Sequence, residues 1–341
     1  MEKKMDELAE RLCAQGEYVG LSVLVMRGGE PIYRKLCGYA DQERGRPIEE
    51  DTIFHLYSMT KPITAAAVMK LWEDGEIDLM DPVSRYLPAF TEQKVWQNGV
   101  LSDRVGEIEL HDLLNMTSGI PYPGDQAAPS FNRLFEEAEA SVDSPDAFTT
   151  VELANRIGRE PLSFQPGERW MYGASADVLG AVVEVVTGMR FGEYLRREIF
   201  EPLGMTRTGY RFFGNVTDHL VTPCRREEDG SLVQVPAMMD ENMQPDATYE
   251  AGGAGLFSTV SDYSKFVATL ANGGIMPDGE QLIGRKTIDL LRDNQFNADQ
   301  LKELRNFYNA GYGYGLGVRT MMGRALGNSN GTPGEFGWTG A

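Results

Sequence analysis

Cysteine, histidine and basic residues are scarce in this chain of 341 residues. Cys13, Cys37 and Cys224 are odd in number and far apart, so they indicate neither a disulfide framework nor a cysteine metal site. The 32 Lys and Arg residues stand against 51 Asp and Glu, and the net charge of −19 argues against a nucleic-acid partner or an anionic membrane surface. The three histidines are widely separated and form no persuasive zinc site, so the sequence implies no metal and no organic cofactor.

Long apolar runs are also missing, and none approaches the roughly 18 residues of a membrane-spanning helix. Residues 1–16 alternate charge with Met5, Leu8, Leu12 and Cys13, which is typical of an amphipathic surface helix and not of a secretory signal. We therefore expect no membrane partner and a cytoplasmic location. The oligomeric state is not encoded in any pattern we recognise.

Apolar residues make up 42% of the chain, which is ample for a packed core. Residues 20–25 and 32–36 predict a β-hairpin, and strand-like patterns return at 313–320 after a helical stretch at 286–305. Residues 81–200 are mostly helix and loop, with a helix at 176–186. These patterns predict an α/β (α+β) fold in which residues 1–80 and 201–341 form a sheet domain, and residues 81–200 form an inserted, mainly helical domain.

The segment 58–61, Ser-Met-Thr-Lys, places a hydroxyl and an amine one turn apart at the start of an apolar helix. Residues at i and i+3 share a helix face, so Lys61 can reach the Ser58 oxygen and accept its proton. Burial and the positive end of the helix both disfavour the ammonium form. A Ser three residues before a Lys occurs about once by chance in a chain of this length, so the pattern needs support from its surroundings.

Two further segments offer that support. Tyr172 lies just before the predicted helix at 176, where a phenol beside a cationic Lys61 can share protons with it, although a tyrosine in a Trp- and Met-rich stretch is more often packing. Residues 334–341, Gly-Glu-Phe-Gly-Trp-Thr-Gly-Ala, are small enough for a backbone to approach a bound group. An edge strand here can supply half of an oxyanion hole, with the N–H of Ser58 as the other half.

Three segments in this order resemble the motifs of the serine β-lactamase superfamily, especially its family VIII carboxylesterases. They are 58–61, then 166–172 (Pro-Gly-Glu-Arg-Trp-Met-Tyr), then 336–340 (Phe-Gly-Trp-Thr-Gly). Lesser matches at 113–119, 201–205 and 252–259 occur in similar order in class C β-lactamases, family VIII esterases and related peptidases. The resemblance covers nearly the whole chain and implies an antiparallel sheet flanked by helices, with an inserted all-helical region.

By the same resemblance, Ser58 is the acylated nucleophile and Lys61 and Tyr172 are the proton-transfer pair. The N–H groups of Ser58 and Ala341 form the oxyanion hole, and Trp338 lines the acyl pocket. Superfamily members continue for tens of residues past this last motif, so we expect a C-terminal segment beyond Ala341.

Two departures from the family pattern bear on the substrate. β-Lactamases usually read Tyr-Ser-Asn or Tyr-Ala-Asn where this chain has Ala174 two residues after Tyr172, so the amide that holds a β-lactam side chain is absent. They read Lys-Thr-Gly where this chain has Trp338, Thr339 and Gly340, so an indole replaces the cation that meets a substrate carboxylate. Family VIII esterases commonly carry Trp at this position, which favours esters without a carboxylate.

We therefore predict a serine hydrolase that cleaves small-molecule carboxylic esters through an acyl-enzyme on Ser58. Short acyl chains are favoured because no extended apolar groove can be read from the sequence. A β-lactamase, a D-amino-acid peptidase or amidase, an acyltransferase, and a non-catalytic acyl-binding sensor of the same fold stay open as alternatives.

A rival nucleophile is Ser329, whose surroundings at 327–331 fit the Gly-Xaa-Ser-Xaa-Gly elbow of α/β-hydrolases. That elbow needs a strand before it and a helix after it, whereas this segment lies among Gly, Asn and Pro. His55, His111 and His219 are the only bases for a Ser-His-Asp triad, and none has a recognisable setting. We interpret His55, three residues before Ser58, as structural.

Overall fold

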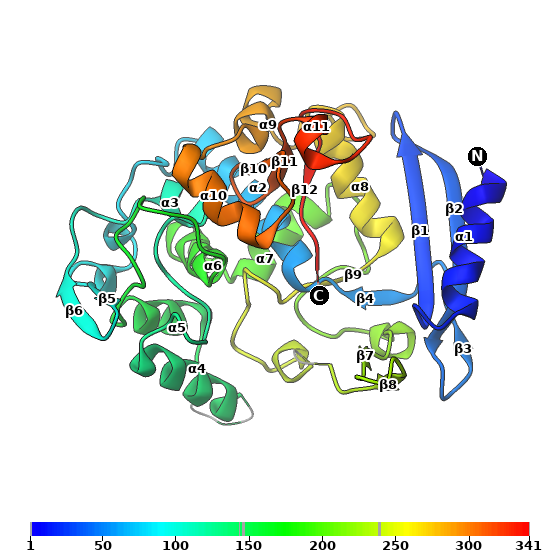
Figure 1. Ribbon diagram of the computed structural model, residues 1–341, viewed down its shortest axis with the longest axis horizontal. Coiled ribbons are helices and arrows are strands. Elements are labelled where there is room, and N and C mark those ends of the chain that lie inside the picture. The colour runs from blue at the N-terminus through cyan, green and yellow to red at the C-terminus, as the bar shows by residue number, and fades with distance from the viewer. Residues whose placement is uncertain (1, 143, 145–146, 238–239, 341) are drawn as a thin grey trace. The chain divides into compact units, whose positions relative to one another are not determined.

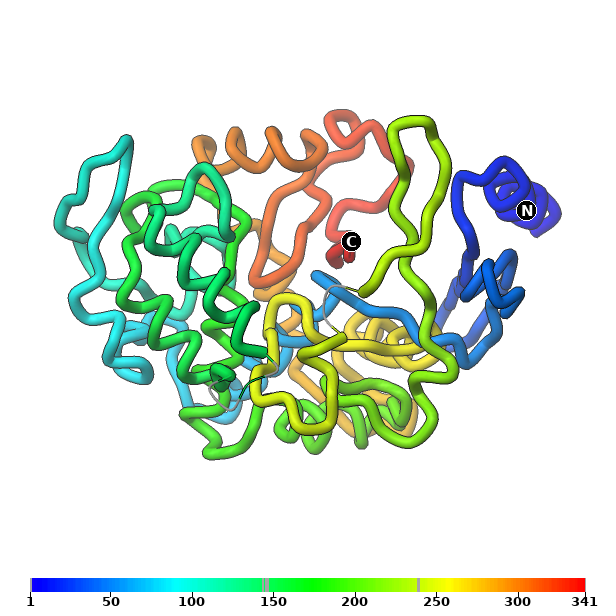
Figure 2. The backbone as a smooth tube through the Cα atoms, turned by 90° about the horizontal axis from the view of Figure 1, so that it is seen from below, coloured from blue at the N-terminus to red at the C-terminus, as the bar shows by residue number. Residues whose placement is uncertain are grey.

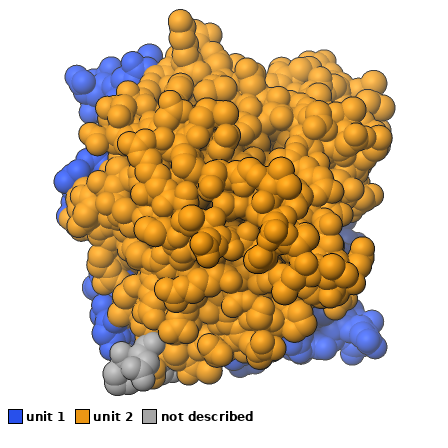
Figure 3. All heavy atoms as spheres, turned by 90° about the vertical axis from the view of Figure 1, so that its left-hand side faces the viewer, with its two compact units in different colours: residues 1–56, 196–246, 255–282 blue, residues 57–195, 247–254, 283–341 orange. Residues whose placement is uncertain are grey.

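The computed structural model describes residues 2–142, 144, 147–237 and 240–340 (Figure 1). The chain divides into two compact units, coloured separately in Figure 3. Unit 1 comprises residues 1–56, 196–246 and 255–282, and unit 2 comprises residues 57–195, 247–254 and 283–341. This division assigns 57–80 and 283–341 to the same unit as the helical segment, whereas the sequence grouped them with the sheet. The domain boundaries expected from the sequence, 1–80 with 201–341 around 81–200, stay a prediction.

Unit 1 begins with an amphipathic helix followed by an antiparallel sheet. Helix α1 (Glu2–Ala14) packs beside β2, where the Tyr33 hydroxyl donates to Asp6 and Lys35 donates to Glu10. Strands β1 (Gly20–Arg27) and β2 (Glu30–Asp41) form the expected hairpin, and β3 (Arg46–Pro47) adds to β2. The hairpin is longer than the sequence predicted because the ladder continues past both ends of the apolar runs, to Arg27 and Glu30 at the tip and to Gly20 and Gly38 at the other end.

The rest of unit 1 packs on a second, short strand pair. Strand β4 (Ile53–His55) pairs antiparallel with β9 (Phe257–Thr259), and the Thr259 side chain caps α8 (Val260–Ala271). Apolar side chains of Ile53, Val216, Met243 and Phe257 form a core around this pair. The remaining elements are η4 (Arg196–Phe200), η5 (Val216–His219), β7 (Cys224–Arg226), β8 (Leu232–Gln234) and η6 (Glu241–Met243).

Unit 2 contains most of the helices and one three-stranded antiparallel sheet, β10-β11-β12, drawn orange to red in Figure 2. Its helices are η1 (Tyr57–Met59), α2 (Thr60–Glu73), η2 (Val83–Arg85), η3 (Pro88–Phe90), α3 (Leu110–Leu114), α4 (Pro129–Ser141), α5 (Thr150–Ile157), α6 (Ser175–Thr187), α7 (Phe191–Leu195), α9 (Arg285–Arg292), α10 (Ala298–Phe307) and α11 (Arg324–Gly327). Its strands are β5 (Lys94–Gln97), β6 (Val100–Asp103), β10 (Tyr312–Tyr314), β11 (Arg319–Met321) and β12 (Phe336–Gly337). The antiparallel strands and flanking helices confirm the fold class.

Helices α2 and α6 form the centre of unit 2 because both are apolar on nearly every face. Small residues such as Ala65 and Ala67 on α2 are fully buried and allow close helix packing. Helix α6 ends at Gly188, whose φ of +67° is the left-handed conformation that glycine adopts without a steric cost. This packing fixes the first turn of α2, and therefore Lys61, against the start of α6.

Two sequence-based predictions for unit 2 need correction in detail. The helical stretch expected at 286–305 is two helices, α9 and α10, because the Asn297 side chain accepts from two backbone N–H groups and starts a new helix. The strand expected at 313–320 is two strands, β10 and β11, joined by a turn at Gly317, whose φ is +77°. In the described residues, no helix is both long and apolar enough to cross a membrane.

Candidate active site

Ser58 lies in the short 3₁₀ turn η1, directly before α2, and is partly exposed. The preceding residue, Tyr57, has a φ of +45°, a left-handed conformation that is strained for a bulky aromatic side chain. Backbone strain of this kind is concentrated at functional sites, because surrounding contacts must hold it in place. The turn therefore presents Ser58 in a fixed and partly open position.

Lys61 is the centre of the site. Its side chain is only 1% exposed, and its Nζ lies 3.3 Å from Ser58 Oγ, 3.1 Å from the Tyr122 hydroxyl and 2.8 Å from the carbonyl oxygen of Gly253. As an ammonium group, Lys61 can donate one hydrogen bond to each of these oxygens. As a neutral amine, it can instead accept the proton of the Ser58 hydroxyl. The predicted contact between Ser58 and Lys61 is therefore present in the geometry.

Tyr122 is the contact that the sequence did not reveal. It lies in the loop at 121–124, which reads as a turn between two prolines, and nothing in that pattern indicates chemistry. Burial raises the pKa of Tyr122 well above its usual value, and the nearby Asp177 and Tyr172 add to that effect. Its phenol therefore stays protonated at neutral pH and can accept a hydrogen bond from Lys61 while donating one of its own.

Tyr172 contacts Lys61 through its ring and not through its hydroxyl. Lys61 Nζ lies 4.5 Å from the centre of the Tyr172 ring, within the range of a cation–π contact. The Tyr172 hydroxyl accepts a hydrogen bond of 3.1 Å from Trp338 Nε1. The structure thus brings Tyr172 to Lys61, as expected, while its role in proton transfer stays a prediction.

A buried carboxylate holds the backbone that binds Lys61. Asp177, on the first turn of α6, accepts hydrogen bonds from the Gly253 N–H at 3.0 Å and from the Tyr249 hydroxyl at 2.9 Å. Burial raises the pKa of Asp177, and the positive charge of Lys61 lowers it. Asp177 and Lys61 therefore bind opposite ends of one residue, Gly253.

The glycine pair 252–253 has no room for side chains. A Cβ on Gly252 would lie 2.2 Å from the carbonyl oxygen of Ala176, and a Cβ on Gly253 would lie 2.9 Å from the Tyr122 hydroxyl. The Thr64 hydroxyl also donates to the Gly252 carbonyl at 2.6 Å. The sequence singled out this segment only as a lesser family match, and the structure gives the physical reason: the backbone must approach both α2 and α6 closely.

The C-terminal motif lies at a sheet edge, as expected. Strand β12 pairs with β11, and Trp338 follows it directly. Trp338 is partly buried, Thr339 and Gly340 are exposed, and Ala174 is buried at the N-cap of α6. Ala341, expected to complete the oxyanion hole, lies outside the described residues, so its role and that of the Ser58 N–H stay predictions.

The competing nucleophile and bases have other partners. Ser329 follows α11 instead of a strand, and its hydroxyl accepts from the Gly331 N–H at 3.1 Å, so the α/β-hydrolase elbow is not formed. In unit 2, His111 Nε2 lies 3.2 Å from Gln295. In unit 1, His55 Nε2 lies 3.3 Å from Asp240, and His219 Nδ1 lies 2.9 Å from Asp51.

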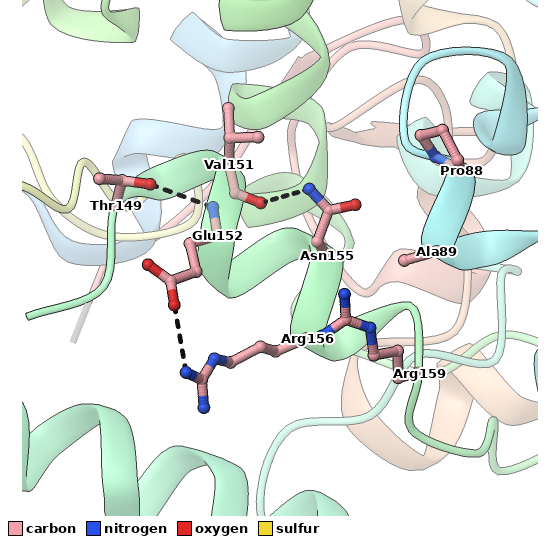
Figure 4. A pocket seen from close by; sticks show the side chains of 8 residues that line it. All are labelled: Pro88, Ala89, Thr149, Val151, Glu152, Asn155, Arg156 and Arg159. Atoms are coloured by element: carbon pink, nitrogen blue, oxygen red, sulfur yellow. Dashed lines mark hydrogen bonds and ion pairs between the residues drawn. The ribbon is translucent and has the colours of Figure 1, made fainter. Parts of the chain in front are cut away.

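The predicted site residues do not line the surface hollow of unit 2. Across the described ranges, no group of three or more His, Cys, Asp or Glu side chains is arranged to hold a metal ion. The surface hollow of unit 2 has a volume of about 740 Å³, and Figure 4 shows the side chains that line it. It is lined by Pro88, Ala89, Thr149, Val151, Glu152, Asn155, Arg156 and Arg159, none of which belongs to the Ser58 site.

Known proteins resemble this chain in sequence and in fold. The β-lactamase family profile matches residues 5–341. The chain is 34% identical to the esterase EstB of Burkholderia gladioli over 290 residues, which cover 81% of this chain and 71% of EstB. The solved structure of EstCE1, described as a hydrolase with promiscuous acyltransferase activity, has a TM-score of 0.84 at 25% identity and covers 99% of this chain and 87% of its own. Simvastatin synthase LovD of Aspergillus terreus shares the fold, with a TM-score of 0.80 at 23% identity over 98% of this chain and 86% of LovD. The chain therefore belongs to the β-lactamase family and is a serine hydrolase of the β-lactamase fold.

Proposed function

We propose that this protein hydrolyses carboxylic esters of small molecules, with short acyl chains, through an acyl-enzyme on Ser58. The observation that carries the proposal is the 3.3 Å contact between Ser58 Oγ and the buried Lys61 Nζ. A serine hydroxyl is a weak nucleophile unless a neighbouring base takes its proton. Lys61 is the base in contact with Ser58, and it lies in a setting that excludes most water.

The reaction proceeds in two acyl-transfer steps. Ser58 Oγ attacks the carbonyl carbon of the ester while its proton passes to Lys61 Nζ, which gives a tetrahedral intermediate. The intermediate collapses as the bond between the acyl carbon and the alcohol oxygen breaks, and the alcohol leaves with the proton from Lys61. Water then attacks the acyl carbon and gives a proton to the same base. Finally, Ser58 regains its proton as the carboxylic acid departs.

Hydrogen bonds around Lys61 support its role in these steps. The Gly253 carbonyl and the Tyr122 hydroxyl hold Nζ in one position as the proton arrives and leaves. Because Tyr122 stays protonated, it can stabilise either form of Lys61 without adding a negative charge. We assign Tyr172 to the same proton exchange on the basis of the motif it belongs to and its ring contact with Lys61.

Two side chains favour esters over β-lactams. Trp338 presents an indole, and not a cation, where a β-lactam carboxylate needs a positive partner. Ala174 is buried and offers no amide to a β-lactam side chain. EstB, the relative at 34% identity, is described as an esterase, which agrees with this preference.

The test compares p-nitrophenyl acetate, butyrate and octanoate with the wild type, Ser58→Ala and Ser329→Ala. We expect turnover of the two short esters, a loss of at least about a thousandfold in kcat for Ser58→Ala, and no change for Ser329→Ala, which has lost only the rival nucleophile. Full esterase activity in Ser58→Ala would disprove the proposal. Faster turnover of a chromogenic cephalosporin than of either short ester would instead assign a β-lactamase.

Acyl transfer to an alcohol is a second candidate, because EstCE1, at 25% identity, is described as a hydrolase with promiscuous acyltransferase activity. The same acyl-enzyme serves both reactions, since only the acceptor of the acyl group differs. Adding a primary alcohol to the ester assay separates them: a new ester product in place of the free acid marks a transferase. We also propose a cytoplasmic location, and cell fractionation tests it.

A further inference from the structure

Phe307, the last residue of α10, is 54% exposed and yet contacts three other aromatic rings. The centre of its ring lies 5.3 Å from Tyr172, 5.3 Å from Trp170 and 6.3 Å from Trp338. Single exposed apolar side chains are common on protein surfaces and need no explanation. Phe307 is different because its exposed ring continues a group of partly exposed rings at the Ser58 site.

We call the rings of Tyr172, Phe307 and Trp338 the aromatic wall. Phe307 is nearly parallel to Trp338, with 8° between the ring planes, and is 28° from Tyr172. All three side chains are partly or largely exposed. Neighbouring rings that are each partly exposed offer an apolar surface against which another planar ring can stack.

The wall begins at the reactive groups. Tyr172 belongs both to the wall and to the surroundings of Lys61, whose Nζ lies 4.5 Å from its ring centre. Lys61 Nζ in turn lies 3.3 Å from Ser58 Oγ. A substrate whose carbonyl carbon reaches Ser58 therefore has the wall beside it.

Buried groups behind the wall make it rigid. Tyr314 is fully buried and meets Trp338 edge to face at 5.2 Å, and the Trp338 Nε1 hydrogen bond fixes Tyr172. Gln300 on α10 donates to the Gly167 carbonyl at 2.9 Å, which ties the helix that carries Phe307 to the segment before Tyr172. A preformed surface loses little conformational freedom when a ligand binds, so it can select for shape.

We propose that the aromatic wall binds a planar ring of the substrate, so that this protein prefers aryl esters to saturated esters of the same size. The inference rests on the proposed ester hydrolysis and adds a substrate class to it. Stacking between aromatic rings contributes beyond the area that it buries, and we expect a preference of about three- to tenfold in kcat/KM, carried by KM.

The experiment compares pairs of esters that differ only in whether the ring is planar. The rate of hydrolysis is measured by titrating the released acid at constant pH. Methyl phenylacetate and methyl cyclohexylacetate place the ring on the acyl side, and benzyl acetate and cyclohexylmethyl acetate place it on the alcohol side. In all four esters a methylene separates the ring from the ester group, so the ring is not conjugated with it and reactivity within each pair is closely matched. The pair that shows the aryl preference identifies which side of the ester meets the wall.

Phe307→Leu tests the wall itself, since it keeps an apolar side chain and removes the ring. We expect it to bring the aryl-to-cyclohexyl ratio of kcat/KM close to one in the pair where the wild type shows a preference. Phe213→Leu is the matched control: Phe213 is 45% exposed, lies in unit 1 and has its ring centre 5.9 Å from that of Phe257, and its replacement should leave the ratio unchanged. Both rates of a ratio come from one preparation, so a loss of folded protein cancels.

Two results would overturn the inference: equal efficiency for aryl and cyclohexyl esters in both wild-type pairs, or a ratio that Phe307→Leu does not change. Methyl butyrate, which has no ring, separates these results from a failure of the proposed function. If the wild type hydrolyses methyl butyrate and Ser58→Ala does not, esterase activity stands whatever the ratios are. If no ester is hydrolysed, both proposals fall.

Discussion

Lys61 in unit 2 and His55 in unit 1 are both buried bases, but their surroundings differ. Lys61 lies within 3.3 Å of three oxygens from three separate segments, one of them the partly exposed hydroxyl of Ser58. His55 lies 3.3 Å from Asp240, and burial lowers the pKa of His55 to about 4 and raises that of Asp240. His55 is therefore neutral at pH 7.

The difference predicts that Lys61 is reactive and that His55 is not, although both side chains are buried. Lys61 is connected by one hydrogen bond to Ser58, the proposed nucleophile, which is partly exposed, so we expect a change in the protonation of Lys61 to affect turnover. His55 is enclosed in the core around β4 and β9, so a change in its protonation can only affect folding. We expect substitutions at the first base to alter turnover, and substitutions at the second to alter the pH dependence of stability.

The largest expected effect follows from Lys61→Met, which keeps the length of the side chain and removes the amine. We expect the kcat of ester hydrolysis to fall by about a hundred- to ten-thousandfold, because Ser58 loses its general base. Initial rates with p-nitrophenyl butyrate measure the loss, and His55→Gln at pH 7.5 serves as the matched control with wild-type turnover. An equal loss of turnover in His55→Gln would end the distinction between the two bases.

A smaller effect concerns the pH dependence of unfolding. The native pKa of His55 is about 4 and its usual value is 6.5, so the unfolded chain binds a proton between these values and the native protein does not. The free energy of unfolding should therefore decrease as the pH falls from about 6.5 to about 4, by about 3 kcal/mol from this group. Asp240, with its raised pKa, works in the opposite direction at low pH.

Urea unfolding at several pH values measures this dependence. His55→Gln should flatten the curve between about pH 6.5 and pH 4, and the difference between variant and wild type isolates the histidine from the carboxylates. Lys61→Met should follow the wild-type slope over that range. A wild-type slope in His55→Gln would show that the histidine does not carry the effect.

The smallest effect is expected for Asp177→Asn, which keeps the shape of a positioning residue and removes its charge. Asn can still accept from the Gly253 N–H, but the carboxylate no longer stabilises the positive charge of Lys61. We expect kcat to fall by about tenfold, or about 1.4 kcal/mol, with little change in KM and with a shifted pH profile. Asp262→Asn in unit 1 is the matched control, because that buried carboxylate also accepts from a backbone N–H, at 2.7 Å from Arg207. An unchanged pH profile in Asp177→Asn would contradict the positioning role.

The sequence predicted those parts of the site that depend on local spacing. Ser58 and Lys61 are three residues apart, so helical geometry alone brings them together. Tyr172 and Trp338 were found because their segments resemble family motifs, and the 3.1 Å hydrogen bond between them follows from the tertiary fold. Tyr122 and Asp177 were missed: one lies in a proline-flanked loop and the other in an ordinary helix turn.

The fold, like the site, was predicted where the sequence pattern is local and was missed where it depends on contacts between distant segments. The hairpin of β1 and β2 and the helix α6 follow from local periodicity and a glycine stop, and both are present. The break between β10 and β11 was not predicted because apolar residues, Leu316 and Val318, continue across the turn. The break between α9 and α10 was not predicted because Asn297 was not recognised as a helix cap. Long-range pairing such as β4 with β9 leaves no mark in either segment alone.

The proposed role of Lys61 also leads to an expectation about when the protein gains activity during folding. Its contacts close loops of 61 residues to Tyr122 and 192 residues to Gly253, and the Tyr172–Trp338 hydrogen bond closes one of 166 residues. Each closure costs chain entropy before it yields any contact, so pairs this distant in sequence form slowly. The contacts around Lys61 are therefore expected to form only after these distant segments have packed together. We expect recovery of turnover during refolding to measure these long-range contacts in unit 2, and not the formation of local structure.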